Sequence, residues 1–220
     1  MINKPTKPVD PERGIIVGVT GGIASGKSTV SRLLAEKGAF TINLDEIGHE
    51  LLKRGSPVMD ELLEAFGPDI LDASGDVSRK KLGAIVFADN AAREQLNAIM
   101  HPPIVQRSQS EAHRLVADDA DCVVVIDIPL LIEGGRHHLV DVIVVVTTSP
   151  ENQLQRLLER SIEESRPLSV EEAQARISAQ IPLSEKEKFA HFVIDNNGAF
   201  EELSRQVDQL WIEFRRLKTL

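Results

Sequence analysis

A phosphate-loop pattern near the start of the chain constrains the fold more than any other feature. Residues 21–28 read GGIASGKS, which fits G-x-x-x-x-G-K-[ST], and the apolar run Ile15–Val19 comes directly before them. After the loop, apolar side chains continue at helical spacing as far as Gly38. We therefore expect a strand, a phosphate-binding loop and a helix, in that order.

The residue types within this loop predict that it binds a nucleoside triphosphate. Glycine permits backbone conformations with positive φ, so consecutive N–H groups can point at a polyphosphate beside the positive end of the helix. Lys27 is expected to reach the β- and γ-phosphates, and the Ser28 hydroxyl to bind Mg²⁺. The expected nucleotide-binding residues of the loop are Gly22, Ile23, Ala24, Ser25, Gly26, Lys27, Ser28 and Thr29. An ordinary glycine-rich turn is the alternative, and the strand and helix around the loop argue against it.

The composition is that of a globular protein and narrows the classes of function. The 220 residues are 42% hydrophobic and 27% charged, which fits one α/β domain with insertions. No apolar run approaches the roughly 20 residues that cross a bilayer, so we expect no membrane partner. The net charge of −9 argues against a broad nucleic-acid-binding face.

The single cysteine and the N-terminal residues suggest where the protein works. Cys122 leaves no intrachain disulfide, which favours a reducing cytoplasm, and we expect it to be a small buried side chain rather than a catalytic thiol. Residues 1–13 contain prolines among charged residues and no apolar segment of the secretory type. We expect a disordered tail there.

Five apolar segments are predicted to be strands, at about residues 14–20, 39–43, 121–128, 141–147 and 191–194. Two of them, residues 123–126 and 142–146, are continuous runs of mostly β-branched residues, as expected for strands buried on both faces of a parallel sheet. The pattern predicts a doubly wound α/β core.

Long segments between these strands predict insertions into the core. We expect the core at residues 14–49, 109–154 and 187–220, a helical insertion for the acceptor substrate at 50–108, and a lid over ATP at 155–186. Helical spacing predicts helices at 46–53, 58–66, 79–87, 91–100, 151–160, 170–180 and 200–217. Ser169 and Glu172 fit a capping box for the sixth of these. Trp211 and Phe214 are assigned to packing of the last helix, so we expect a monomer or a weak homo-oligomer.

Asp45 follows the second strand and is the candidate general base. In a doubly wound sheet the carboxyl ends of the strands face the ligand crevice, where a carboxylate could accept the proton of an attacking hydroxyl. The alternative is that Asp45 caps a helix that starts at Glu46, and the two roles are compatible. Asp127 ends the third predicted strand and is the candidate magnesium aspartate, acting through water, with Glu133 as a weaker candidate.

Three arginines and one histidine complete the candidate site. Arg156 and Arg160 share a helix face, and together with Arg176 they are expected to stabilise charge on the transferred phosphoryl group. The alternative is a solvated helix face on which they pair with nearby glutamates. His101 is a candidate contact for the acceptor, or a cap where Pro102 and Pro103 end the helix before them.

Several separated motifs together resemble the dephospho-coenzyme A kinase family. They are Thr20–Val30, the Asp45 segment, Leu96-Asn97 with His101-Pro102, Pro129–Leu131 with Glu133, Arg176 with Gln180, and Val193–Gly198. The resemblance covers about residues 15–197. It implies a P-loop kinase of the nucleoside-monophosphate-kinase-like group, with a three-layer fold and a five-stranded parallel sheet in the order 2-3-1-4-5.

The resemblance also implies an activity and its ligands. It implies phosphorylation of the ribose 3′-hydroxyl of dephospho-CoA by ATP with Mg²⁺, with Asp45 as base, His101 and Pro129 at the acceptor, and Asn196, Asn197 and Gly198 near the adenine. Asn43 departs from the family, which usually has an aspartate there, and the lid looks longer around residues 162–168. The alternatives are another small-metabolite or nucleotide kinase of this architecture and an ATP-binding regulatory protein without catalysis.

Overall fold

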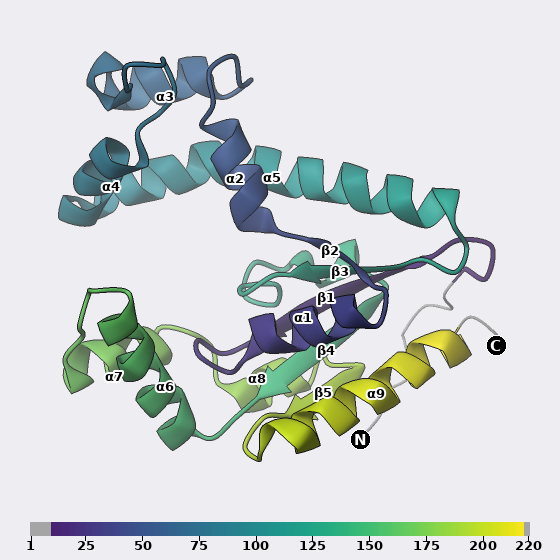
Figure 1. Ribbon diagram of the computed structural model, residues 1–220. Coiled ribbons are helices and arrows are strands. Elements are labelled where there is room, and N and C mark those ends of the chain that lie inside the picture. Colours follow the sequence, from purple (N-terminus) through teal and green to yellow (C-terminus); the bar gives the residue numbers. More distant parts are fainter. Residues whose placement is uncertain (1–9, 218–220) are drawn as a thin grey trace. The chain divides into compact units, whose positions relative to one another are not determined.

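Five parallel strands form one sheet in the computed structural model, which describes residues 10–217 (Figure 1). The strands are β1 (Ile15–Gly21), β2 (Phe40–Ile42), β3 (Val123–Asp127), β4 (Val142–Thr147) and β5 (Phe192–Asp195). Their order across the sheet is β2-β3-β1-β4-β5, and each neighbouring pair is parallel. The predicted fold class and strand order are therefore confirmed.

Burial on both faces explains why the central strands are continuous apolar runs. Every residue of β1 is buried, as are residues 123–126 of β3 and 142–146 of β4. Alternate side chains of a strand point to opposite faces, so these strands need cover on both sides. Cys122, directly before β3, is buried as expected.

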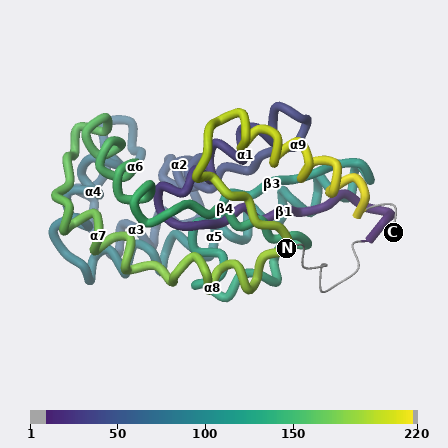
Figure 2. Tube along the Cα trace, turned by 90° about the horizontal axis from the view of Figure 1, so that it is seen from below, coloured from purple at the N-terminus to yellow at the C-terminus, as the bar shows by residue number. Residues whose placement is uncertain are grey.

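Helices α1 (Lys27–Glu36) and α9 (Phe200–Leu217) cover one face of the sheet. Their apolar side chains share one buried cluster with the strands, and Trp211 packs against it. Figure 2 shows α1 and α9 on one side of the strands and the short helix α8 (Leu183–Glu187) on the other. No helix was predicted from the sequence at the position of α8.

The lid predicted at residues 155–186 corresponds to most of α6 (Pro150–Glu163), to α7 (Val170–Ser178) and to most of α8. The capping box is confirmed, since the Glu172 N–H donates to the Ser169 hydroxyl at 3.1 Å and the Ser169 N–H donates to the Glu172 carboxylate at 2.8 Å. Such reciprocal bonds satisfy two N–H groups that a helix leaves without partners at its start. A 3-10 turn, η2 (Arg136–Leu139), lies between β3 and β4.

Residues Asn43–Glu111 form a separate compact unit. It contains α2 (Leu44–Leu51), α3 (Met59–Phe66), the 3-10 turn η1 (Pro68–Ile70), α4 (Arg79–Ala88) and most of α5 (Asn90–Asp118). The unit is larger than the predicted insertion at residues 50–108, because α2 packs on α5. Gly48 lies against Ile104, and Glu50 pairs with Arg107.

Helix α5 corrects the expectation that Pro102 and Pro103 end a helix. The helix continues through both prolines and is 29 residues long. Each proline removes one helix hydrogen bond, at a cost of about 3 kcal/mol. Buried residues on either side, Met100, Ser108 and Ala112, hold the helix together. Despite its length, neither α5 nor any other helix among residues 10–217 is long and apolar enough to cross a membrane.

Arg13 is fixed to the core although it was expected to lie in a loose tail. Its guanidinium makes two bonds to the Asp141 carboxylate, at 3.0 and 2.6 Å, and the same carboxylate accepts from the Ile16 N–H at 2.9 Å. Asp141 thus ties the residues before β4 to the start of β1. Residues 1–9 of the expected tail lie outside the described part of the chain.

Candidate nucleotide site

The phosphate loop, residues 21–28, turns β1 into α1 and needs glycine at its last turn. Gly26 is the N-cap of α1 with a φ of 95°, in the left-handed region that other residues rarely adopt. A Cβ atom at Gly26 would overlap the Asn196 side-chain amide. Lys27 and Ser28 follow at the start of α1, where N–H groups have no acceptor inside the helix and attract anions.

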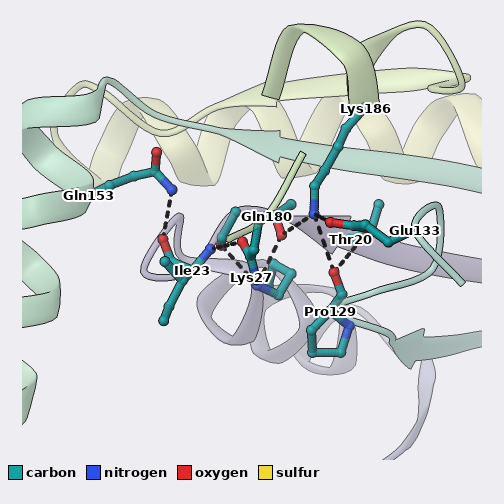
Figure 3. Close-up of polar contacts among 10 residues, drawn as sticks. Thr20, Ile23, Lys27, Pro129, Glu133, Gln153, Gln180 and Lys186 are labelled. Atoms are coloured by element: carbon teal, nitrogen blue, oxygen red, sulfur yellow. Dashed lines mark hydrogen bonds and ion pairs between the residues drawn. The ribbon is translucent and has the colours of Figure 1, made fainter. Parts of the chain in front are cut away.

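Three side chains from distant segments hold the backbone of this loop. The Ile23 N–H donates to Gln180 Oε1 at 2.8 Å, and the Ile23 carbonyl accepts from Gln153 Nε2 at 2.8 Å (Figure 3). The Ser25 carbonyl accepts from Asn196 Nδ2, also at 2.8 Å. Between them Ala24 adopts a φ of 57°, which costs a non-glycine residue roughly 1 to 2 kcal/mol. These contacts keep a strained loop in one conformation.

The Lys27 ammonium folds back onto its own loop. It donates to the Gly22 carbonyl at 3.0 Å and to the Gly21 carbonyl at 3.4 Å. Burial lowers the pKa of Lys27, the charge of Asp127 opposes that shift, and the charge of Lys186 adds to it. A phosphate group could replace these carbonyls as partner and would favour the charged amine.

Lys186 of α8 lies beside the loop and is fully buried. Its ammonium is 2.6 Å from the Glu133 carboxylate and also donates to the Gly21 and Pro129 carbonyls at 3.3 and 3.4 Å (Figure 3). Pro129 also accepts from the Thr20 hydroxyl at 3.3 Å. Glu133 therefore serves as counter-ion to a lysine, and its role as a weaker magnesium candidate stays a prediction.

Asp127 lies at the end of β3, paired in register with Val19, two residues before the loop begins. Its influence on the Lys27 pKa places its charge close to the loop. The Ser28 side chain is exposed in the first turn of α1. No cluster of three His, Cys, Asp or Glu side chains that could hold a metal occurs among residues 10–217. One hydroxyl and one aspartate fit Mg²⁺, which binds mainly through phosphates and water, better than they fit a metal held by protein alone.

The three candidate arginines differ in their surroundings. Arg156 on α6 is half-buried and donates to the Asn196 carbonyl at 3.0 Å, while its second terminal nitrogen is buried with no hydrogen-bond partner among the described residues. Arg160 is exposed and lies 3.4 Å from Glu164, and its charge still lowers the pKa of Lys27. Arg176 is exposed in the last turn of α7. Arg156 and Arg160 thus lie close to the loop, and Arg156 has a donor to spare.

The asparagines after β5 have roles in the protein itself. Asn196 holds Ser25, as described above. The Asn197 side-chain oxygen Oδ1 accepts from the Ser149 N–H at 2.6 Å and from the Thr148 hydroxyl at 3.2 Å, which fixes the junction between β4 and α6. A Cβ atom at Gly198 would meet the Glu202 carboxylate.

Asp45 and His101 belong to the separate helical unit. Asn43, not Asp45, is the N-cap of α2, since its side chain accepts from the Asp45 N–H at 3.0 Å. The alternative of Asp45 as helix cap is therefore wrong, and its carboxylate is exposed in the first turn. His101 is exposed in the middle of α5, so it does not cap a helix end.

Gln153 and Lys186 are site residues that sequence reasoning missed, and Gln180 entered only as part of a family motif. A glutamine or lysine on a helix is ordinarily a solvated residue, and no local spacing distinguishes these three. The contacts that bring them to the loop join residues far apart in the chain.

Comparison with known proteins identifies the family of this chain. A family model described as Dephospho-CoA kinase matches residues 15–202. A dephospho-CoA kinase of Geobacillus kaustophilus (strain HTA426) is 45% identical over 193 residues, 88% of this chain and 93% of the relative. One from Arabidopsis thaliana is 44% identical over 201 residues, 91% of this chain and 84% of the relative. The solved structure of dephospho-CoA kinase from Campylobacter jejuni has a TM-score of 0.69 and 28% identity, covering 91% of this chain and 97% of that one. The family match runs from β1 through the phosphate loop and the lid segment into α9, and the chain belongs to the dephospho-CoA kinase family.

Proposed function

We propose that this chain transfers the γ-phosphoryl group of ATP to the ribose 3′-hydroxyl of dephospho-CoA, which gives CoA and ADP in the last step of coenzyme A biosynthesis. The observation that carries this proposal is a preformed phosphate loop in a chain that matches the family from residue 15 to residue 202. The names of its relatives favour this acceptor over another metabolite, and favour catalysis over simple ATP binding.

On the ATP side, the loop backbone from Gly22 to Thr29 binds the phosphates, and Lys27 moves from its carbonyl partners to the β- and γ-oxygens. The Ser28 hydroxyl holds Mg²⁺, with Asp127 acting through a bound water. When bound, the ion neutralises charge on the phosphates. Support comes from the orientation of the helix start, from the exposed Ser28 hydroxyl and from the half-buried Asp127 at the neighbouring strand end.

On the acceptor side, Asp45 takes the proton of the ribose hydroxyl as its oxygen attacks phosphorus. The carboxylate is suited to this because Asn43 performs the capping task at α2 and leaves Asp45 exposed. His101 and Pro129 contact the acceptor. The transfer is direct, in line and without a phosphoenzyme.

Three arginines act from the lid segment, and the loop after β5 lies near the adenine base of ATP. Arg156, Arg160 and Arg176 stabilise charge that spreads over the transferred group. The buried terminal nitrogen of Arg156 that has no partner within residues 10–217 supports its part in this, because an unmet guanidinium N–H group favours an anionic ligand. Asn196, Asn197 and Gly198 lie near the adenine.

An acceptor panel tests the proposal directly. The protein is incubated with Mg-ATP and, in turn, dephospho-CoA, nucleoside monophosphates and shikimate, and ADP is measured. We expect acceptor-dependent ADP only with dephospho-CoA. Turnover with a different acceptor would assign another kinase activity, and ATP binding without turnover on any acceptor would indicate a regulatory protein.

The setting of the reaction is part of the same proposal. We place it in the cytoplasm, because the chain has a single cysteine and its substrates are small soluble metabolites. The enzyme acts as a monomer or a weak homo-oligomer. Light scattering across a range of protein concentrations tests the second statement.

A further inference from the structure

Two consecutive peptide groups of the phosphate loop, Gly22–Ile23 and Ile23–Ala24, are each held by a side-chain amide. The Ile23 N–H donates to Gln180 and the Ile23 carbonyl accepts from Gln153, both at 2.8 Å. Because Ile23 offers one donor and one acceptor, it fixes which end of each glutamine amide faces it. Gln153 is 5% exposed and lies where a side chain at residue 22 would be, so Gly22 makes room for it.

The two glutamines come from the two ends of the segment that contains α6 and α7. Gln153 is in the first turn of α6, and Gln180 lies two residues after the end of α7. The helices between them carry Arg156, Arg160 and Arg176. Both ends of the arginine-bearing segment are therefore fastened to a single residue of the loop.

The peptide group that Gln153 holds, Ile23–Ala24, leads into the strained residue of the loop. Ala24 has a φ of 57°, and such a conformation persists only where its surroundings enforce it. The next residues, Ser25 and Gly26, lead into the N–H groups at the start of α1. A change at Ile23 would let the Ile23–Ala24 peptide relax and would turn N–H groups away from the phosphates.

We propose that Gln153 and Gln180 are positioning residues for ATP, which hold the peptide groups on either side of Ile23 so that the phosphate loop keeps its binding conformation before the nucleotide arrives. The inference rests on the proposed binding of ATP at this loop. When the loop is already ordered, none of the free energy of ATP binding is used to order it. Loss of either amide therefore raises the KM for ATP. Once phosphates are bound they hold the loop themselves, so kcat changes less, and the KM for dephospho-CoA stays the same.

The first test replaces each glutamine by methionine, which keeps the length of the side chain and removes its hydrogen bonds. We expect Gln153→Met and Gln180→Met each to raise the KM for ATP about fivefold, the effect of one lost hydrogen bond. The matched control is Gln155→Met on the same helix, because Gln155 is exposed and bonds only Glu159. That control leaves both KM values unchanged. Because both glutamines hold the backbone of the same residue, Ile23, the double variant raises the KM for ATP less than the product of the single effects.

A second test separates the hydrogen bond from charge. Gln180→Glu keeps an acceptor for the Ile23 N–H, whereas Gln153→Glu places an acceptor against the Ile23 carbonyl. Both changes add one negative charge beside the same residue, so repulsion of ATP affects them alike. We expect the Gln153→Glu protein to have the higher KM for ATP.

Failure of this inference can be told apart from failure of the proposed function. KM values for ATP within twofold of wild type in both methionine variants would overturn the inference. A fall in kcat together with equal rises in the KM for dephospho-CoA and the KM for ATP would also overturn it, because that pattern indicates general damage to the enzyme. Wild-type protein that binds no ATP in equilibrium dialysis would overturn the proposed site itself, and the inference with it.

Discussion

The ammonium of Lys186 lies 2.6 Å from the carboxylate of Glu133, and this ion pair joins α8 to the loop after β3 beside the phosphate loop. The Lys186 side chain is 0% exposed and that of Glu133 is 18% exposed, so the charges are largely removed from water. The ammonium also meets the Gly21 carbonyl, which Lys27 contacts from its own side. Lys186 can therefore keep this carbonyl satisfied when Lys27 moves to a phosphate.

Breaking this pair at one end is expected to destabilise the protein. Lys186→Met leaves the Glu133 carboxylate buried without a counter-ion, which costs about 3 kcal/mol in the free energy of unfolding. The double variant Lys186→Met/Glu133→Gln removes both charges and recovers part of that loss. Urea denaturation measures both.

Lys188→Met serves as the control for this experiment. Lys188 pairs with Glu185 on the same helix, but both side chains are exposed. Its loss is expected to change stability by less than about 0.5 kcal/mol. Equal effects at Lys186 and Lys188 would show that the buried pair contributes no more than a surface pair.

Two glycines with similar backbone angles allow strain and steric overlap to be separated. Gly26 has a φ of 95° and Gly38 a φ of 104°, but only at Gly26 does an added Cβ meet another group, the Asn196 amide. We expect Gly38→Ala to cost about 1 kcal/mol in unfolding free energy, from backbone strain alone. Gly26→Ala is expected to cost about 3 kcal/mol and to abolish ATP binding, because overlap adds to strain and displaces the loop. Similar costs at both positions would mean that the Asn196 contact is easily moved.

Local and repetitive features of the fold could be predicted from the sequence. The runs at residues 123–126 and 142–146 identify buried parallel strands because every residue there is apolar. The phosphate loop is a continuous segment, and its glycines indicate where the backbone can adopt a positive φ. The capping box at Ser169 is equally local, and it is confirmed.

Features that depend on distant contacts could not be predicted. Helix α8 has five residues and is held by the buried Lys186 rather than by an apolar stripe. Pro102 and Pro103 are strong local signals for a helix end, yet packing of α5 on both sides of them outweighs their cost. Asn43 was noted from the sequence only as a departure from the family's usual aspartate, and its capping bond became visible in the structure alone.

The proposed roles of Asp45 and Lys27 predict catalytic losses without unfolding. Asp45→Asn and Lys27→Ala are expected to lower turnover by orders of magnitude, since each removes a group that acts on the reacting atoms. Asp45 is exposed, so its change to asparagine should leave the melting temperature unaltered. Steady-state assays with dephospho-CoA measure both effects. Near-normal turnover of the Asp45→Asn protein would remove the general-base assignment.

His191 gives the fold a predictable sensitivity to acid. Its ring Nδ1 accepts from the Ile143 N–H at 2.8 Å, and the backbone N–H of His191 donates to the Ile143 carbonyl at 2.9 Å, which joins the start of β5 to β4. Burial lowers the pKa of His191 below its ordinary value. The neutral ring is therefore favoured in the folded state. Its stabilising effect is complete above the unfolded-state pKa of about 6.5 and is lost as the pH falls through the lower folded-state pKa.

His191→Asn isolates this effect, because the asparagine carbonyl can accept the same hydrogen bond and does not titrate. We expect wild type to lose more unfolding free energy than His191→Asn between about pH 7.5 and about pH 5, measured by urea denaturation at each pH. His113→Asn, at an exposed position on α5, is the control and should follow the wild-type curve. Parallel curves for wild type and His191→Asn would show that protonation of His191 does not contribute to the loss of stability in acid.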